Sequence, residues 1–203
     1  MLGEYRMPRT ATVERTTTET SVRVTVNLDG TGAAEIHTGV PFLDHMLELF
    51  AKHSLCDVAV NATGDTHIDD HHTVEDIGLC LGDALAKALG AKAGIERYGC
   101  VLLPMDEALA EVALDLSGRP FLVFHVVWEQ EKIKNFDVTL VEEFWRAVAT
   151  RAQMNLHICV RYGKDAHHVS EAIFKGVARA LARAVAHDPR RAGIPSTKGT
   201  LSA

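Results

Sequence analysis

One short pattern, two adjacent histidines followed three residues later by a glutamate, occurs twice in this chain of 203 residues. It stands at His71-His72-Thr73-Val74-Glu75 and again at His167-His168-Val169-Ser170-Glu171, a displacement of 96 residues. A pattern that recurs after nearly half the chain indicates an internal duplication. We therefore expect two copies of one structural unit, residues 1–95 and 96–203, that together form a single compact catalytic unit.

The segments around the two patterns also correspond. Apolar residues recur at helical spacing just after each pattern, which predicts that the histidines begin a helix in both copies. A β-prone run precedes each pattern, at 56–62 and at 156–162. An amphipathic helical segment precedes each of these runs, at 41–53 and at 139–153. Both copies are therefore expected to end in the order helix, strand, helix.

Two further β-prone runs precede each amphipathic segment. They span 22–28 and 33–37 in the first half, and 108–116 and 121–128 in the second, and turn-forming residues join each pair. We expect each pair to form a hairpin, so that each half reads β-β-α-β-α. This order predicts an α+β fold in which the two halves pack their helices between two sheets.

The charge balance limits the partners that such a fold could bind. Lys and Arg number 21 against 27 Asp and Glu, and this net charge of -6 offers no general basic surface for nucleic acid or an anionic membrane. No apolar stretch has the length of a membrane span and no apolar leader stands near the start, so neither export nor membrane insertion is expected. Four widely spaced cysteines without a C-x-x-C pair are typical of a reducing cytoplasm.

The repeated pattern has the geometry of a metal-binding arm. A histidine and a glutamate three or four residues apart share one face of a helix and can reach the same point. Neighbouring helical residues point about 100° apart, so His71 and His72 are expected to serve two different ions, as are His167 and His168. One arm has too few donors for a closed coordination sphere. Further ligands are expected from the other repeat or from a neighbouring subunit.

One residue in each amphipathic segment completes the expected donor set. His45 lies in the first segment, and its counterpart in the second is Glu143. The expected metal ligands are His45, His71, His72, Glu75, Glu143, His167, His168 and Glu171. Imidazole and carboxylate donors without a thiolate fit Mn, Fe or Zn, and a six-coordinate site with an exchangeable position favours Mn. Which histidine of each pair serves which ion stays open.

The two arms resemble the paired signatures of the imidazoleglycerol-phosphate dehydratase family, and further blocks that resemble it lie at 28–32, 38–46, 104–107, 115–120 and 195–199. No phosphatase domain accompanies these blocks, so the monofunctional form is expected. The resemblance implies a hydro-lyase of histidine biosynthesis that dehydrates D-erythro-imidazole-glycerol phosphate to imidazole-acetol phosphate on two Mn ions per subunit. It also implies the ribosomal protein S5 domain 2-like fold and a shell of 24 subunits with the ions between subunits.

The resemblance assigns roles to individual residues. Glu19 matches a substrate-contacting carboxylate and is expected to transfer a proton. The expected catalytic residues are Glu19, His71, His72, Glu75, His167, His168 and Glu171. The expected substrate contacts, mostly with the phosphate, are Glu19, His45, His53, Arg97, Arg119, Lys175, Ser196, Thr197 and Lys198. Many relatives carry histidine where this chain has Glu143, and the added negative charge predicts a shifted metal preference.

Two alternatives use the same residues. A dinuclear metallohydrolase of phosphate esters also needs two ions and nearby cations, although its ligands are commonly dominated by aspartate rather than histidine. A metal-stapled oligomeric shell without catalysis would use the histidine pairs only to join subunits. Glu19 and the expected phosphate cations favour an enzyme, because a shell needs neither.

Overall fold

The computed structural model describes residues 8–201, where strands and helices alternate in two successive sets. The first set contains β1 (Thr10–Thr16), β2 (Thr20–Asn27), β3 (Ala34–His37), α1 (Pro41–Ser54), β4 (Asp57–Gly64) and α2 (His71–Leu89). The second contains β5 (Tyr98–Met105), β6 (Ala108–Asp115), β7 (Phe121–His125), β8 (Lys132–Ile133), β9 (Phe136–Asp137), α3 (Thr139–Ala152), β10 (Asn155–Tyr162) and α4 (Ala166–Val185). Both arms begin helices, as the spacing predicted.

The two halves share one topology. The first sheet has the strand order β1-β2-β4-β3 and the second β5-β6-β10-β7, so each strand of the first sheet has a counterpart in the second. This confirms the α+β fold with an internal duplication. The predicted halves, 1–95 and 96–203, extend at their outer ends beyond the described residues, and the boundary between them stays a prediction. No helix in residues 8–201 is long and apolar enough to cross a membrane.

The hairpins expected between 22–28 and 33–37, and between 108–116 and 121–128, are wrong. In each half the strand after the first helix lies between these two runs: β4 pairs antiparallel with β2 and parallel with β3, and β10 does the same with β6 and β7. The turn residues belong to a loop that crosses to the far side of this inserted strand. In the first half, Asp57 holds that loop by accepting the backbone N–H groups of Thr31 and Ala33 at 2.8 and 3.0 Å.

The hairpin partner in each half is a strand that the apolar pattern did not predict. β1 pairs with β2 and β5 with β6, so each half reads β-β-β-α-β-α. β1 is an edge strand in which only Val13 is buried, and such a polar strand shows no apolar alternation. The small β8–β9 hairpin, which follows β7, was not expected either and has no counterpart in the first half.

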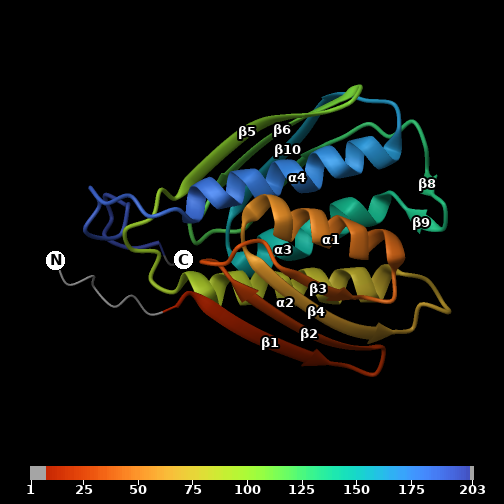
Figure 1. Cartoon of the computed structure of the whole chain (residues 1–203), viewed down its shortest axis with the longest axis horizontal. Helices are drawn as coiled ribbons and strands as arrows, with labels where there is room; N and C mark the ends of the chain where they lie inside the picture. The colour runs from red at the N-terminus through yellow and green to blue at the C-terminus, as the bar shows by residue number, and fades with distance from the viewer. Residues whose placement is uncertain (1–7, 202–203) are drawn as a thin grey trace.

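The helices form a layer between the two sheets, as expected (Figure 1). α2 packs on β1 and β2, and α4 packs on β5 and β6. The other two helices cross between the halves, because α1 of the first half packs against α4 and α3 of the second half packs against α2. Neither half therefore buries its helices without the other.

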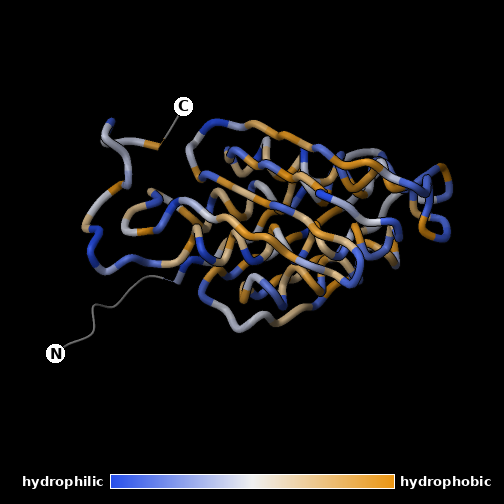
Figure 2. Tube along the Cα trace, turned by 90° about the horizontal axis from the view of Figure 1, so that it is seen from above, coloured by the Kyte–Doolittle hydropathy of each residue, from blue (hydrophilic) through white to orange (hydrophobic). Residues whose placement is uncertain are grey.

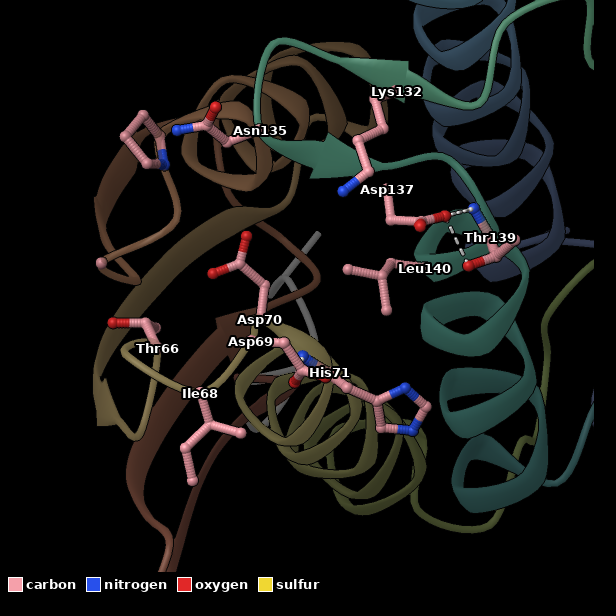
Figure 3. Close-up of a pocket in the computed structure, with 12 residues that line it drawn as sticks. Thr66, Ile68, Asp69, Asp70, His71, Lys132, Asn135, Asp137, Thr139 and Leu140 are labelled. Carbon is pink, nitrogen blue, oxygen red and sulfur yellow. Dashed lines mark hydrogen bonds between the residues drawn. The ribbon is translucent and has the colours of Figure 1, made fainter.

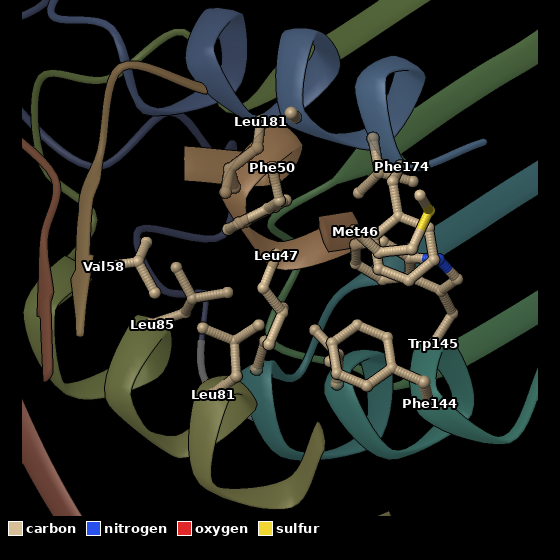
Figure 4. Close-up of a cluster of buried hydrophobic side chains, with 14 of the residues drawn as sticks. Met46, Leu47, Phe50, Val58, Leu81, Leu85, Phe144, Trp145, Phe174 and Leu181 are labelled. Atoms are coloured by element: carbon tan, nitrogen blue, oxygen red, sulfur yellow. The ribbon is translucent and has the colours of Figure 1, made fainter. Parts of the chain in front are cut away.

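The core lies where the four helices meet (Figure 4). Each helix contributes large apolar side chains that are less than 2% exposed: Met46, Leu47, Phe50, Leu81, Leu85, Phe144, Trp145, Phe174 and Leu181. Burying one such side chain contributes about 1.5–3 kcal/mol. The contact between the halves is therefore the main hydrophobic core and not a secondary interface.

The segment after α4 closes one end of the molecule. Residues 187–201 contain no helix or extended strand, and Figure 2 shows them at one end of the hydropathy-coloured trace, beyond the body of the molecule. The segment is anchored on the loop before β5, because Gly94 donates its backbone N–H to Gly193 at 2.9 Å and Arg97 donates to the carbonyl of Pro195 at 2.8 Å. This end lies opposite the N-termini of α2 and α4.

Two glycines allow α2 and α3 to approach closely. A Cβ atom at Gly78 would lie 2.8 Å from the carbonyl oxygen of Phe144 and 2.9 Å from the Cβ of Ala147. A Cβ atom at Gly82 would lie 2.7 Å from the carbonyl oxygen of Val148. Glycine lowers helix stability by about 1 kcal/mol relative to alanine, so its presence at both contact points reflects the close packing of the two helices.

Replacing Gly78 by alanine is therefore expected to lower the free energy of unfolding by up to about 2 kcal/mol. The steric cost of overpacking, about 1–3 kcal/mol, outweighs the gain in helix propensity. Denaturant unfolding of the variant measures this, with Lys87→Ala at an exposed position of α2 as the matched control. A more stable Gly78→Ala variant would contradict the close contact between α2 and α3.

Candidate active site

Three expected metal ligands from both halves converge at the N-terminal end of the helical layer. His45 lies in the first turns of α1, and His167 and Glu171 lie one turn apart in α4. Nε2 of His45 is 2.9 Å and Nε2 of His167 is 3.2 Å from Oε1 of Glu171. The three ligand atoms all lie within 4.8 Å of one another, and two imidazoles with one carboxylate form a donor set that suits Mn, Fe or Zn. We call these three residues the second-half cluster.

The carboxylate of this cluster is ionised. Burial alone would raise the pKa of Glu171, which is 7% exposed, but Lys175, His45 and His167 lower it to about 2. Nζ of Lys175 lies 2.6 Å from Oε2 of Glu171, one helical turn further along α4. Oε1 faces the two histidines while Oε2 is held by the lysine. The cluster thus presents a charged oxygen to a cation without first having to lose a proton.

His71, the first-half counterpart of His167, lies at a cavity beside the N-terminal ends of α2 and α3 and the β8–β9 hairpin. His71 lines this cavity of about 640 Å³ together with Asp70, Lys132 and Leu140. Figure 3 shows His71 directed towards α3, with Asp70 and Lys132 pointing into the cavity from opposite sides. In residues 8–201, His71, Glu75 and Glu143 do not converge as tightly as the second-half cluster.

Glu75 and Glu143 stay predicted ligands. Each lies about one helical turn from a residue of this cavity, because Glu75 follows His71 in α2 and Glu143 follows Leu140 in α3. Glu143 is half-buried, and an oxygen of its carboxylate lies 3.9 Å from Nε of Arg146. An arginine this close to the position of a ligand would compete with a metal ion for the same carboxylate.

The two rings of each histidine pair diverge, as the helical repeat predicted. The ring centroids of His71 and His72 are 6.1 Å apart at an interplanar angle of 86°, and those of His167 and His168 are 6.2 Å apart at 81°. His167 belongs to the second-half cluster, whereas His168 contacts Glu107 at the β5–β6 turn. The second histidine of each pair therefore faces away from the ligands that surround the first.

Carboxylates that the sequence analysis did not assign bind these outer histidines. Nδ1 of His72 lies 2.9 Å from Oδ2 of Asp65, and Nδ1 of His168 lies 2.7 Å from Oε2 of Glu107. Residues 104–107 contributed to the family resemblance, but nothing in their spacing indicates a contact with a histidine 61 positions further along the chain. Glu19, the expected proton-transfer residue, lies close to the first of these pairs, with Oε2 3.9 Å from Nδ1 of His72.

Five of the expected substrate-binding residues line a second cavity, at the opposite end of the molecule. This cavity of about 770 Å³ is lined by Arg97, Arg119, Ser196, Thr197 and Lys198, with Tyr98, Arg191, Pro195, Thr200 and Leu201. Asp115 orients the guanidinium of Arg97 through contacts of 2.6 and 3.0 Å. Four cations, Arg97, Arg119, Arg191 and Lys198, all from the second half of the chain, thus surround a space suited to a phosphate group. We call it the cationic cavity.

Lys175 and His53, which were expected to contact substrate, lie away from the cationic cavity. Lys175 is bound to Glu171 in the second-half cluster. His53 lies at the end of α1, and burial together with the nearby charges of Lys175 and Arg179 lowers its pKa. A contact with the phosphate at the cationic cavity of the same chain is therefore not available to either residue.

The family model of imidazoleglycerol-phosphate dehydratase matches residues 38–181, which include both arms and the second-half cluster. The chain belongs to this family. The imidazoleglycerol-phosphate dehydratases of Geobacillus thermodenitrificans and Methylorubrum populi are 56% and 57% identical to it over 195 and 194 residues. These alignments cover 96% and 95% of this chain and 100% of each relative.

Solved structures carry the same family name. The crystal structure of imidazoleglycerol-phosphate dehydratase from Staphylococcus aureus matches with a TM-score of 0.81 at 41% identity, covering 88% of this chain and 99% of that chain. A crystal structure of the Pyrococcus furiosus protein matches with a TM-score of 0.81 at 36% identity, covering 93% and 100%. As a member of the imidazoleglycerol-phosphate dehydratase family the chain is a hydro-lyase, which excludes both the shell without catalysis and the phosphate-ester hydrolase.

Removing one ligand of the second-half cluster is expected to weaken metal binding. The variant His45→Ala loses one of three convergent donors. Loss of a residue that only orients a ligand already lowers metal affinity by about tenfold or more. We therefore expect the affinity of the metal-free variant for Mn²⁺ to fall at least tenfold. Calorimetric titration with Mn²⁺ measures the change, and His37→Ala, an exposed histidine of β3, is the control. Equal affinities in the two variants would remove His45 from the ligand set.

Proposed function

We propose that this chain catalyses the metal-dependent dehydration of D-erythro-imidazole-glycerol phosphate to imidazole-acetol phosphate and water, a step of L-histidine biosynthesis. The observation that carries the proposal is the convergence of His45, His167 and Glu171 from both halves of a chain in this family. The names of its relatives describe the same dehydration. The free thiols of its four cysteines are in keeping with a reducing cytoplasm, where we place the enzyme.

The residues around the two arms fit a metal ion. The proposed ligands are His45, His71, His72, Glu75, Glu143, His167, His168 and Glu171, and we propose two Mn ions per subunit. Histidine and carboxylate donors without thiolate support Mn over softer metals. When bound, a divalent metal acts as a Lewis acid that stabilises negative charge on a bound imidazole ring. The ionised carboxylate of Glu171 and the two imidazoles beside it are already arranged to receive such an ion.

The proton that leaves with the hydroxyl group needs a protein base. Loss of water removes a hydroxyl from one carbon and a proton from the next, and the resulting enol becomes the ketone after a further proton transfer. Glu19 lies in the β1–β2 turn, its side chain is 52% exposed, and its carboxylate lies beside the ring of His72. We assign the proton transfer to Glu19, because it combines an exposed carboxylate with a place beside one of the two arms.

The cationic cavity would bind the phosphate of the substrate. The net charge of the chain, -6, repels anions at long range, so binding depends on local cations. Arg97 is held by Asp115, whereas Arg119 and Lys198 leave their charged groups available in the cavity, and Ser196 and Thr197 add hydroxyl donors.

In a single chain, one substrate molecule cannot place its phosphate in the cationic cavity and its imidazole ring at the second-half cluster. Arg97 donates its backbone N–H to Ala184 at the end of α4, whereas His167 lies in the first turn of the same helix. Their separation along this helix is about 25 Å at 1.5 Å per residue, which the three-carbon chain of the substrate does not span. The complete site therefore needs more than one subunit, and we propose a homo-oligomer of 24 subunits as the family resemblance implies.

Product formation from imidazole-glycerol phosphate tests the function directly. Metal-stripped protein is expected to be inactive, and addition of Mn²⁺ is expected to restore formation of imidazole-acetol phosphate. The assay is run on assembled protein, with Mg²⁺ as the control ion because it favours oxygen ligands over imidazole. Assembled, Mn-loaded protein that forms no product would contradict the proposed function.

The role of the cationic cavity is tested by Arg119→Glu. This change places a negative charge where the phosphate would bind, so we expect KM to rise strongly, by at least tenfold, while the metal content stays unchanged. Steady-state kinetics and elemental analysis measure the two quantities separately. A parallel loss of metal and activity would instead indicate misfolding, and an unchanged KM would exclude Arg119 from phosphate binding.

A further inference from the structure

We infer that Asp65 and Glu107 are positioning residues that hold the outer histidines, His72 and His168, for metal binding. We further infer that Asp65, by holding His72, leaves Glu19 free to transfer a proton. The inference rests on the proposed function and extends it to residues that neither the repeated pattern nor the expected ligand set includes. The two halves of the duplicated fold differ in which carboxylate binds the outer histidine.

In the second half the carboxylate of the hairpin turn holds the histidine. Glu107 immediately precedes β6, and its Oε2 lies 2.7 Å from Nδ1 of His168. Its Oε1 accepts the backbone N–H groups of Asp165 and Lys164, at 2.9 and 3.2 Å, just before α4 begins. Glu107 is thus held at both oxygens by three hydrogen bonds. Such a carboxylate only accepts hydrogen bonds.

In the first half the corresponding carboxylate makes no hydrogen bond to the histidine. Glu19 immediately precedes β2, as Glu107 precedes β6, but it lies 3.9 Å from Nδ1 of His72. Asp65 takes the place beside this histidine instead, with Oδ2 at 2.9 Å. Asp65 follows Gly64 at the end of β4, whereas the equivalent Gly163 is followed by Lys164, which has no carboxylate. The second half therefore needs its turn glutamate for the histidine, and the first half does not.

Both contacts have the same consequence for the imidazole ring. Because the carboxylate accepts a hydrogen bond from Nδ1–H, Nε2 keeps its lone pair and can bind a metal ion. The side chains of His72 and His168 are 38% and 31% exposed, so neither ring is enclosed by the rest of the chain. Asp106 lies 3.7 Å from Nε2 of His168, too far for a hydrogen bond that would occupy it. The other carboxylate oxygen of Asp65, Oδ1, is buried and has no hydrogen-bond partner within the described residues.

The variant Glu107→Gln tests the second-half contact. The amide oxygen still accepts the two backbone N–H groups, but the amide nitrogen now faces Nδ1 of His168. The histidine must then accept there and carry its proton on Nε2, where it blocks the metal. We expect the affinity of metal-stripped, full-length protein for Mn²⁺ to fall by roughly 10–100-fold, with the melting temperature of the metal-free protein unchanged.

Glu111→Gln is the matched control. Glu111 lies in β6, four residues beyond Glu107, and its carboxylate bonds to Arg161 rather than to a histidine. We expect its Mn²⁺ affinity to equal that of the wild type. An unchanged affinity in Glu107→Gln overturns the positioning role, and a fall in melting temperature without a change in affinity assigns Glu107 to stability alone.

A second pair of variants separates Asp65 from Glu19. Asp65→Asn is also expected to lower Mn²⁺ affinity, because an uncharged amide oxygen accepts the hydrogen bond from Nδ1 of His72 less strongly than a carboxylate does. Glu19→Gln is expected to leave Mn²⁺ affinity unchanged and to lower kcat by roughly 10²–10⁴-fold, the usual contribution of a positioned base. The opposite result, with metal binding lost in Glu19→Gln and kept in Asp65→Asn, would overturn the assignment.

Failure of the proposed function can be told apart from failure of this inference. Wild-type protein that binds Mn²⁺ but forms no product contradicts the proposed dehydration, while the affinities of the variants still decide the positioning role. Wild-type protein that does both, with Glu107→Gln and Asp65→Asn unchanged in Mn²⁺ affinity, overturns the inference alone. Wild-type protein that binds no Mn²⁺ overturns both.

Discussion

The packing of first-half helices against second-half helices is the contact on which the rest of the structure depends. α1 lies against α4 and α2 against α3, with Phe50, Trp145 and Phe174 fully buried where they meet. This packing brings His45 of α1 to within 2.9 Å of Glu171 of α4, although 126 residues separate them in the chain. Loss of the shared core would therefore separate the residues of the second-half cluster as well as unfold the chain.

The same arrangement sends the chemical groups to opposite ends of the subunit. α2 and α4 both begin at the end where the arms lie, because the duplication repeats the strand order of the sheets. The cationic cavity lies at the other end, where Arg97 and the C-terminal segment meet. A helix of 20 residues separates the two along the second half. This distance is the physical reason why the proposed site, with the imidazole ring at the arms and the phosphate at the cationic cavity, needs more than one subunit.

Duplication also created two equivalent carboxylates with different surroundings. Glu19 and Glu107 each precede the second strand of a hairpin, but only Glu107 has both oxygens occupied by hydrogen bonds. Asp65 and Lys164, which follow equivalent glycines, account for the difference. Copies of one unit can in this way keep the same histidine and glutamate pattern and still differ in whether the turn carboxylate is bound by hydrogen bonds or exposed.

The sequence by itself determined the duplication, the helices that carry the two arms and the divergence of each histidine pair, because these follow from local periodicity. It also pointed to His45 as a partner of the arms and to the cations of one cavity. The strand pairing, the β1 and β5 partners and the roles of Asp65 and Glu107 were decided only by the tertiary structure. An edge strand such as β1 has no apolar alternation, and a contact such as Glu107 with His168 joins residues that local pattern cannot relate. Long-range packing sets those contacts. It also places the arms and the cationic cavity at opposite ends of the folded subunit.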